Sequence, residues 1–181
     1  GNGKAQGSTS SSKKLHDLIK ATGEYSIEAW VVPANVTQEM ARIVSYSAGD
    51  DARNFTLQQT LYNYEFRHRS TETSLNGDTR LQTPDADEVL QATLQHVVAT
   101  YSPVDGRAIY VNGQLVTQPD PVPTGSLTDW QDTFALVLGN EASGTGLFQG
   151  TFRLVAVHNR VLTPAQIVQN FDVGVGEKFF L

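Results

Sequence analysis

Two acidic side chains, Glu24 and Glu28, are the nearest approach in this chain to a paired-carboxylate reaction centre. Residues four apart in a regular strand lie about 13 Å apart, at roughly 3.3 Å per residue. Glycoside hydrolysis needs carboxyl groups about 5–5.5 Å apart for retention of configuration, or about 6.5–9.5 Å for inversion. The spacing therefore disfavours catalysis by this pair, and we expect a non-catalytic protein.

Other reaction centres also lack the spacing they require. The sequence has no G-x-S-x-G elbow that would expose a nucleophilic serine. No H-x-x-x-H or H-E-x-x-H pattern indicates zinc. The four histidines are scattered, and we expect His96 and His158, in predicted strands, to be hydrogen-bonded structural residues.

Calcium is the better metal candidate, because it takes six to eight oxygen ligands, often gathered from loops. Asp50 and Asp51 offer two adjacent carboxylates between two predicted strands, and Asn140 and Glu141 close another strand. We expect Asp50 or Asp51 to be the first ligand if calcium is bound. The alternative is that these residues simply form turns, which Asp, Asn and Gly favour.

Sugar binding requires exposed aromatic faces and polar groups that satisfy hydroxyls. Trp130 follows a proline-rich segment, and the flanking Asp129 and Asp132 are acceptors for hydroxyl hydrogen bonds. The alternative is that Trp130 closes one end of the core. Glu65 and Arg67 alternate with apolar residues on one predicted strand, so they could line a polar concave surface.

The composition excludes several partners. The net charge of −6, with 13 basic against 19 acidic residues, argues against nucleic acid, because phosphate binding needs a basic surface. Cysteine is absent, so no disulfide or thiolate metal site exists. No run approaches 18 consecutive apolar residues, and we expect no membrane span.

The elements that must position these side chains are mostly short strands. Residues 94–116 hold three apolar or alternating runs, the last two separated by Asn112-Gly113. Asn-Gly is the strongest short-range signal for a hairpin, because a type I′ turn needs positive φ at both central residues. Other strands are predicted at 25–33, 42–47, 54–59, 62–69, 134–138 and 147–158, the last as one strand or two.

Two short helices frame this all-β pattern. One is predicted over 12–21, with Ser11 or Ser12 as N-cap and Gly23 as its stop. The other begins at Pro164 behind Thr163, with Gln166 completing a capping box. We expect residues 71–90 to form a long loop or a poorly formed edge, and the segment before residue 12 to be a tail or an edge segment.

Several phrases, in order over most of the chain, resemble the laminin-G-like branch of the concanavalin-A-like jelly rolls. They are YSIEAWVVP at 25–33, LQHVVATY at 94–101, GRAIYVNGQLV at 106–116, LVLGNE at 136–141 and GTFRLVAVHNRVLTPAQI at 150–167. The resemblance implies a two-sheet antiparallel β-sandwich and a binding module for glycans or proteins. It also implies a calcium ion at a rim, but Phe152, Arg153 and Leu154 replace the family's acidic residue in the closing strand.

From this we expect a tail and short helix over 1–22 and one sandwich domain over 23–181, excised from a larger exported bacterial protein such as an enzyme or adhesin. Neighbouring domains of that polypeptide are expected partners, and the apolar Phe179-Phe180-Leu181 hints at one. Two alternatives remain open: a spacer domain without a ligand, and a hydrolase or lyase with an unrecognised site.

Overall fold

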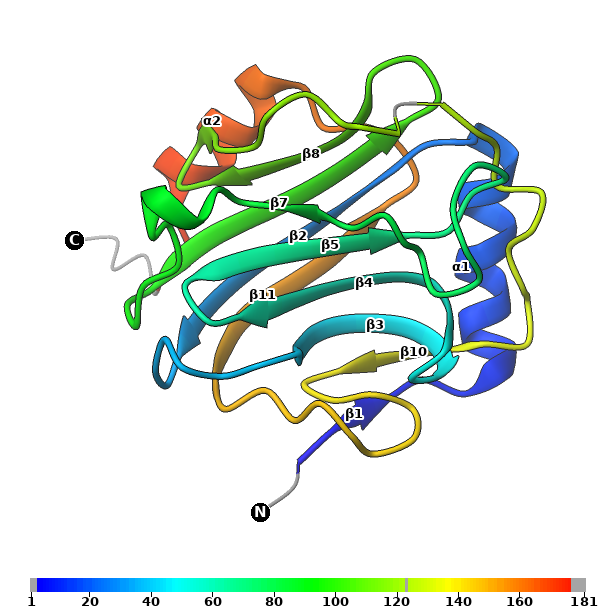
Figure 1. The fold of residues 1–181 in the computed structure, drawn as a ribbon, viewed down its shortest axis with the longest axis horizontal. Helices are drawn as coiled ribbons and strands as arrows, with labels where there is room; N and C mark the ends of the chain where they lie inside the picture. Colours follow the sequence, from blue (N-terminus) through cyan, green and yellow to red (C-terminus); the bar gives the residue numbers. More distant parts are fainter. Residues whose placement is uncertain (1–2, 123, 177–181) are drawn as a thin grey trace.

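The computed structural model describes residues 3–122 and 124–176, and these fold into two packed antiparallel sheets. The predicted all-β sandwich is therefore confirmed. Sheet A has the order β1-β10-β3-β4-β5-β6 and sheet B the order β11-β2-β7-β8-β9. In Figure 1, β3, β4 and β5 lie in front of β2 and β11.

Sheet A is built from six strands that come from separate parts of the chain. They are β1 (Ala5–Gln6), β10 (Ala135–Leu138), β3 (Ala41–Gly49), β4 (Ala52–Thr60), β5 (Asn63–His68) and β6 (Leu81–Gln82). The segment predicted as a tail or an edge segment thus supplies the edge strand β1, which pairs with β10. Inside the predicted loop 71–90 lie β6 and a short 3-10 turn, η1 (Asp85–Asp87).

Sheet B carries the predicted three-stranded run. Its strands are β11 (Gly150–His158), β2 (Tyr25–Pro33), β7 (Gln95–Ser102), β8 (Gly106–Val111) and β9 (Gln114–Leu115). The β8–β9 turn has φ of 50° at Asn112 and 81° at Gly113, as the Asn-Gly pair predicts. The apolar run predicted at 147–158 as one strand or two forms a single strand, β11, with a bulge between Phe152 and Leu154.

The core lies between the sheets and follows from the two-residue alternation. On β2, the side chains of Tyr25, Ile27, Ala29 and Val31 all point inward and are fully buried. They meet the inward residues of β3, β4 and β5 in one cluster. The opposite faces of the same strands are left to carry polar groups, and these form the sites described below.

Helix α1 (Thr9–Thr22) stands along the right-hand edge in Figure 1, and α2 (Pro164–Val173) lies at the upper left. The predicted start of α1 is wrong by three residues, because Ser8 rather than Ser11 or Ser12 caps it. Gly23 ends α1 with φ of 75°, as expected. The capping box of α2 is confirmed, with the Thr163 side chain accepting from Gln166 N.

Within the described residues, no helix is long and apolar enough to cross a membrane. The expectation about Phe179-Phe180-Leu181 falls on residues outside the described part of the chain.

Candidate functional site

The outer face of sheet A, turned away from sheet B, is covered with polar side chains. Cross-strand pairing aligns them in rows, because opposite residues in antiparallel strands share a face. Arg42 on β3 pairs with Gln58 on β4, which pairs with Glu65 on β5. We call this set of side chains the polar face, and all of its members are buried. It consists of Arg42, Ser45, Ser47, Arg53, Thr56, Gln58, Glu65, Arg67 and, from the loop after β10, Glu141.

The Glu141 carboxylate is the most connected group of the polar face. Its Oε2 accepts hydrogen bonds from Arg42 Nε (3.1 Å) and Arg53 Nη1 (3.2 Å). Its Oε1 accepts from Ser45 Oγ (2.8 Å) and from Ser47 Oγ. The carboxylate is fully buried. Two guanidinium groups therefore share one carboxylate, and burial together with the nearby Arg42 charge lowers the pKa of Arg53.

A second cluster of charges lies at the β5 side of the polar face, around Glu65. Arg67 Nε donates to Glu65 Oε1 (2.6 Å), and Arg80 Nε lies 3.2 Å from Glu65 Oε2. Gln58 Nε2 also donates to Oε1 (2.9 Å), which links this cluster to Arg42. Arg67 Nη1 donates to Asp78 Oδ1 (2.9 Å). The side chains of Arg80 and Asp78 are about half exposed, so this cluster is where the polar face meets solvent.

The sequence prediction placed Glu65 and Arg67 together on a polar surface, and the structure brings them into direct contact. It did not identify Arg42, Arg53 and Arg80 as their neighbours. The two-residue alternation along 42–47 indicates that Arg42 faces outward, so the sequence contained a signal for it. Arg80 lies in a loop, where no such alternation indicates its position.

Trp130 was predicted to be an exposed sugar platform, and that exposure is wrong. Its ring is buried among Tyr25, Tyr46 and Phe55, with centroid separations of 5.2 to 6.1 Å, and Nε1 donates to Arg69 O (2.7 Å). A large aromatic ring gains more from core burial than from exposure. The alternative stated above, a tryptophan closing one end of the core, describes its position.

The acids that flank Trp130 stay at the surface near α1. Asp132 lies 3.4 Å from Lys13 Nζ, and Asp129 is exposed. Within the described part of the chain, no hydrogen bond or ion pair joins either of them to Glu65 or Arg67, so the five predicted ligand residues do not form one site. Only the Glu65–Arg67 pair belongs to the polar face.

The four predicted calcium ligands do not form a chelating set. Both Glu141 oxygens are engaged by arginine and serine donors, and Asn140 Oδ1 accepts from Glu141 N (2.8 Å). Asp50 accepts from Ser143 and Thr145 in the loop after β10, while Asp51 is exposed on the β3–β4 turn. A cation at Glu141 would sit against two guanidinium groups, so these residues do not fit calcium. In the described ranges, no cluster of three His, Cys, Asp or Glu side chains could hold a metal ion.

Glu28, one of the two carboxylates considered above as a catalytic pair, lies on the outer face of sheet B under α2. It accepts hydrogen bonds from His96 Nε2 (2.8 Å), His158 Nε2 (3.0 Å) and Asn170 Nδ2 (3.0 Å). Burial alone would raise the pKa of Glu28, but the bonds from His158 and His96 outweigh burial and hold that pKa at about 2. Glu24 instead accepts from Val161 N (3.3 Å). The two carboxylates thus serve separate structural contacts.

The sequence matches the concanavalin A-like lectin/glucanases superfamily over residues 3–168, and the chain belongs to that superfamily. No curated protein matches the sequence.

Solved structures share the fold at low sequence identity. One is the CBM40 of a Ruminococcus gnavus IT-sialidase, at 17% identity and TM-score 0.64, with 84% of this chain and 85% of that chain covered. The same CBM40 bound to α2,3-sialyllactose matches at 19% identity, TM-score 0.62 and the same coverage. The NanB sialidase K499G mutant of Streptococcus pneumoniae matches at 12% and TM-score 0.67, covering 94% of this chain and 26% of that one.

A botulinum neurotoxin DC binding domain in complex with rat synaptotagmin II also matches. It is 13% identical, with TM-score 0.55, and 85% of this chain and 36% of that chain are covered. Binding modules for a glycan and for a protein are therefore among the structures that share this fold.

The Glu28 contacts predict a dependence of stability on acid. Because the folded pKa of about 2 lies below the ordinary 4.5, ionised Glu28 stabilises the fold above about pH 4.5, and this contribution is lost as the pH falls toward 2. We expect Glu28→Gln to be less stable than the parent at about pH 5, with a shallower fall in the free energy of unfolding between pH 5 and 2, measured by urea denaturation.

Glu39→Gln, at an exposed position, is the matched control and should keep the parent's slope. Equal slopes for the parent and Glu28→Gln would contradict the assignment.

The misfit of the calcium ligands predicts that chelation has no effect. We expect the melting temperature in excess EDTA to equal that in excess CaCl2, because the Glu141 carboxylate is already neutralised by arginine. Scanning calorimetry measures this directly. A melting temperature that falls with EDTA and returns with calcium would show that a site exists.

Proposed function

We propose that this chain is a non-catalytic glycan-binding module of an exported multidomain protein, and that its ligand is an acidic glycan held at the polar face. The observation that carries the proposal is the pair of arginines, Arg67 and Arg80, fixed by the two oxygens of Glu65. Neighbouring domains of the same polypeptide would be its other partners.

The two arginines have donors to spare. Arg67 donates from Nε to Glu65 and from Nη1 to Asp78. Arg80 Nε donates to Gln82 Oε1 (3.4 Å) and lies within ion-pair distance of Glu65 Oε2 (3.2 Å). Arg67 Nη2 and both Nη atoms of Arg80 make no hydrogen bond to any residue that the structure describes. A guanidinium edge matches a carboxylate in two parallel hydrogen bonds, and such bonds are roughly twice as strong as neutral ones.

The network behind these arginines prepares them for binding. Arg67 side-chain exposure is only 10%, and Glu65 is held in addition by Gln58 and Thr60. Side chains already ordered in the free protein lose little conformational entropy when a ligand arrives. A sugar acid would thus meet a prearranged pair of donors.

A solved structure of similar fold supports an acidic glycan as the class of ligand. A CBM40 of similar fold is bound to α2,3-sialyllactose, a glycan whose sialic acid carries a carboxylate. Two of the neighbours belong to sialidases, which supports a module within a larger polypeptide. Protein recognition is the second candidate, supported by the neurotoxin binding domain of similar fold that is in complex with synaptotagmin II.

The test is the affinity for α2,3-sialyllactose, measured by calorimetry. We expect Arg67→Ala to weaken binding about tenfold or more, since it removes a charge-assisted hydrogen bond. Arg153→Ala, which removes an exposed arginine from β11 on the other sheet, should bind as the parent does.

Thermal unfolding of both variants separates a lost contact from a lost fold. Failure of the parent to bind any member of a panel of acidic glycans would favour the spacer alternative. Equal binding by Arg67→Ala and the parent would remove the polar face as the ligand site.

A further inference from the structure

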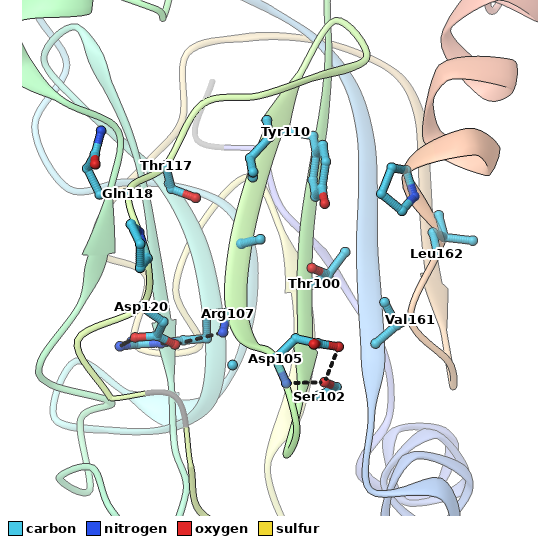
Figure 2. A pocket seen from close by; sticks show the side chains of 15 residues that line it. Thr100, Ser102, Asp105, Arg107, Tyr110, Thr117, Gln118, Asp120, Val161 and Leu162 are labelled. Atoms are coloured by element: carbon cyan, nitrogen blue, oxygen red, sulfur yellow. Dashed lines mark hydrogen bonds and ion pairs between the residues drawn. The ribbon is translucent and has the colours of Figure 1, made fainter.

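A hollow of about 500 Å³ lies on the outer face of sheet B, on the side of the molecule opposite the polar face. Figure 2 shows Tyr110, Thr100 and Ser102 following one another along its floor, which β7 and β8 form. Val161 and Leu162 stand on one side and the 117–120 segment on the other. Its volume is in the range of small-molecule sites, about 300–1,000 Å³.

The floor and walls carry polar groups with unused hydrogen-bonding capacity. Thr100 Oγ1, Tyr110 Oη and the Gln118 amide make no hydrogen bond within residues 3–122 and 124–176. By contrast, Thr117 Oγ1 already accepts from Ile109 N (3.1 Å). Three free polar groups in an otherwise largely apolar hollow are the arrangement that orients a small polar ligand.

The charges around the hollow disfavour an anion. The Arg107 guanidinium already has partners within the protein. Its Nε and Nη2 donate to the two oxygens of Asp120 (2.8 and 2.7 Å), and Nη1 donates to Thr79 O (2.6 Å). The Asp105 carboxylate accepts from Ser102 Oγ (3.2 Å) and has no cationic partner in the described part of the chain. The nearby start of α2 is capped by its own Thr163 and begins with a proline.

We propose that this hollow is a second ligand site and that it binds an uncharged pyranose ring. The half-buried ring of Tyr110 and the aliphatic side chains of Leu115 and Val161 supply apolar surface for the C–H face of the sugar. Thr100, Tyr110 and Gln118 supply hydroxyl and amide partners, and Asp105 accepts hydroxyl hydrogen bonds while repelling acids. The two faces of the sandwich then differ in the charge of the sugar they select.

The test is a titration of the isotope-labelled protein with methyl pyranosides of glucose, galactose, mannose and N-acetylglucosamine, followed by amide chemical shifts. We expect at least one of them to shift amides of β7, β8 and residues 161–164, with a dissociation constant on the order of millimolar for so small a ligand. Methyl glucuronide, the acidic counterpart of the glucoside, should bind at least about threefold more weakly than the neutral sugars.

Three variants connect the shifts to the hollow. Ala108→Phe adds a ring on the floor of the hollow, where it occupies the space for the sugar, and should abolish the chemical-shift changes. Thr100→Val and Tyr110→Phe each remove one hydroxyl and should weaken binding about threefold to tenfold while keeping the fold. Glu39→Gln, at an exposed position that does not line the hollow, should leave the titration unchanged.

Two results would overturn the proposal. One is the absence of shifts around the hollow for every neutral sugar at about 50 mM, well above the expected dissociation constant. The other is binding that survives in Ala108→Phe, or that is strongest for the glucuronide.

Discussion

The polar face depends on one buried ionic interaction, the Glu141 carboxylate held between Arg42 and Arg53. An unpaired charge at such depth would cost several kcal/mol, and removing one member of a buried pair typically costs about 3–5 kcal/mol. The pairing therefore fixes the loop after β10 against β3 and β4. From Arg42 the network continues through Gln58 to Glu65, so the arginines that reach solvent are positioned by a carboxylate that does not.

Sheet B also contains a buried carboxylate, which is stabilised by a different set of partners. This carboxylate, Glu28, accepts hydrogen bonds from two histidines on the neighbouring strands and from Asn170 of α2. Trp30, His96 and Phe171 stack above it, so that part of the outer face is covered. The stretch of β7 and β8 beyond the start of α2 stays open, and there the hollow forms. One sheet thus carries an edge where Arg67 and Arg80 are paired with Glu65 and Asp78, and the other a hollow beside the Asp105 carboxylate.

Local chemistry in the sequence predicted most of the fold. The Asn112-Gly113 turn and the Thr163–Gln166 capping box each depend on residues that are adjacent or nearly so. The alternation along 62–69 also predicted that Glu65 and Arg67 share an outward face. Such signals need no knowledge of distant contacts.

What the sequence could not provide were contacts between distant segments. Glu141 lies 99 positions from Arg42 and 88 from Arg53, so it was assigned to a metal instead of to them. Trp130 follows a loop with no periodicity, and only the packing of Tyr25 and Phe55 around it fixes its burial. The hollow on sheet B combines β7, β8 and two connecting segments, and no local pattern brings these together.

The most direct measurement is a map of amide chemical shifts for the protein titrated with α2,3-sialyllactose. Selection of a sugar acid by prearranged arginines predicts that the largest changes occur at Glu65, Arg67 and Arg80 and fade toward α1. Changes confined to the surroundings of Trp130, or a spectrum unaltered by the sugar while an uncharged analogue perturbs β5, would contradict it.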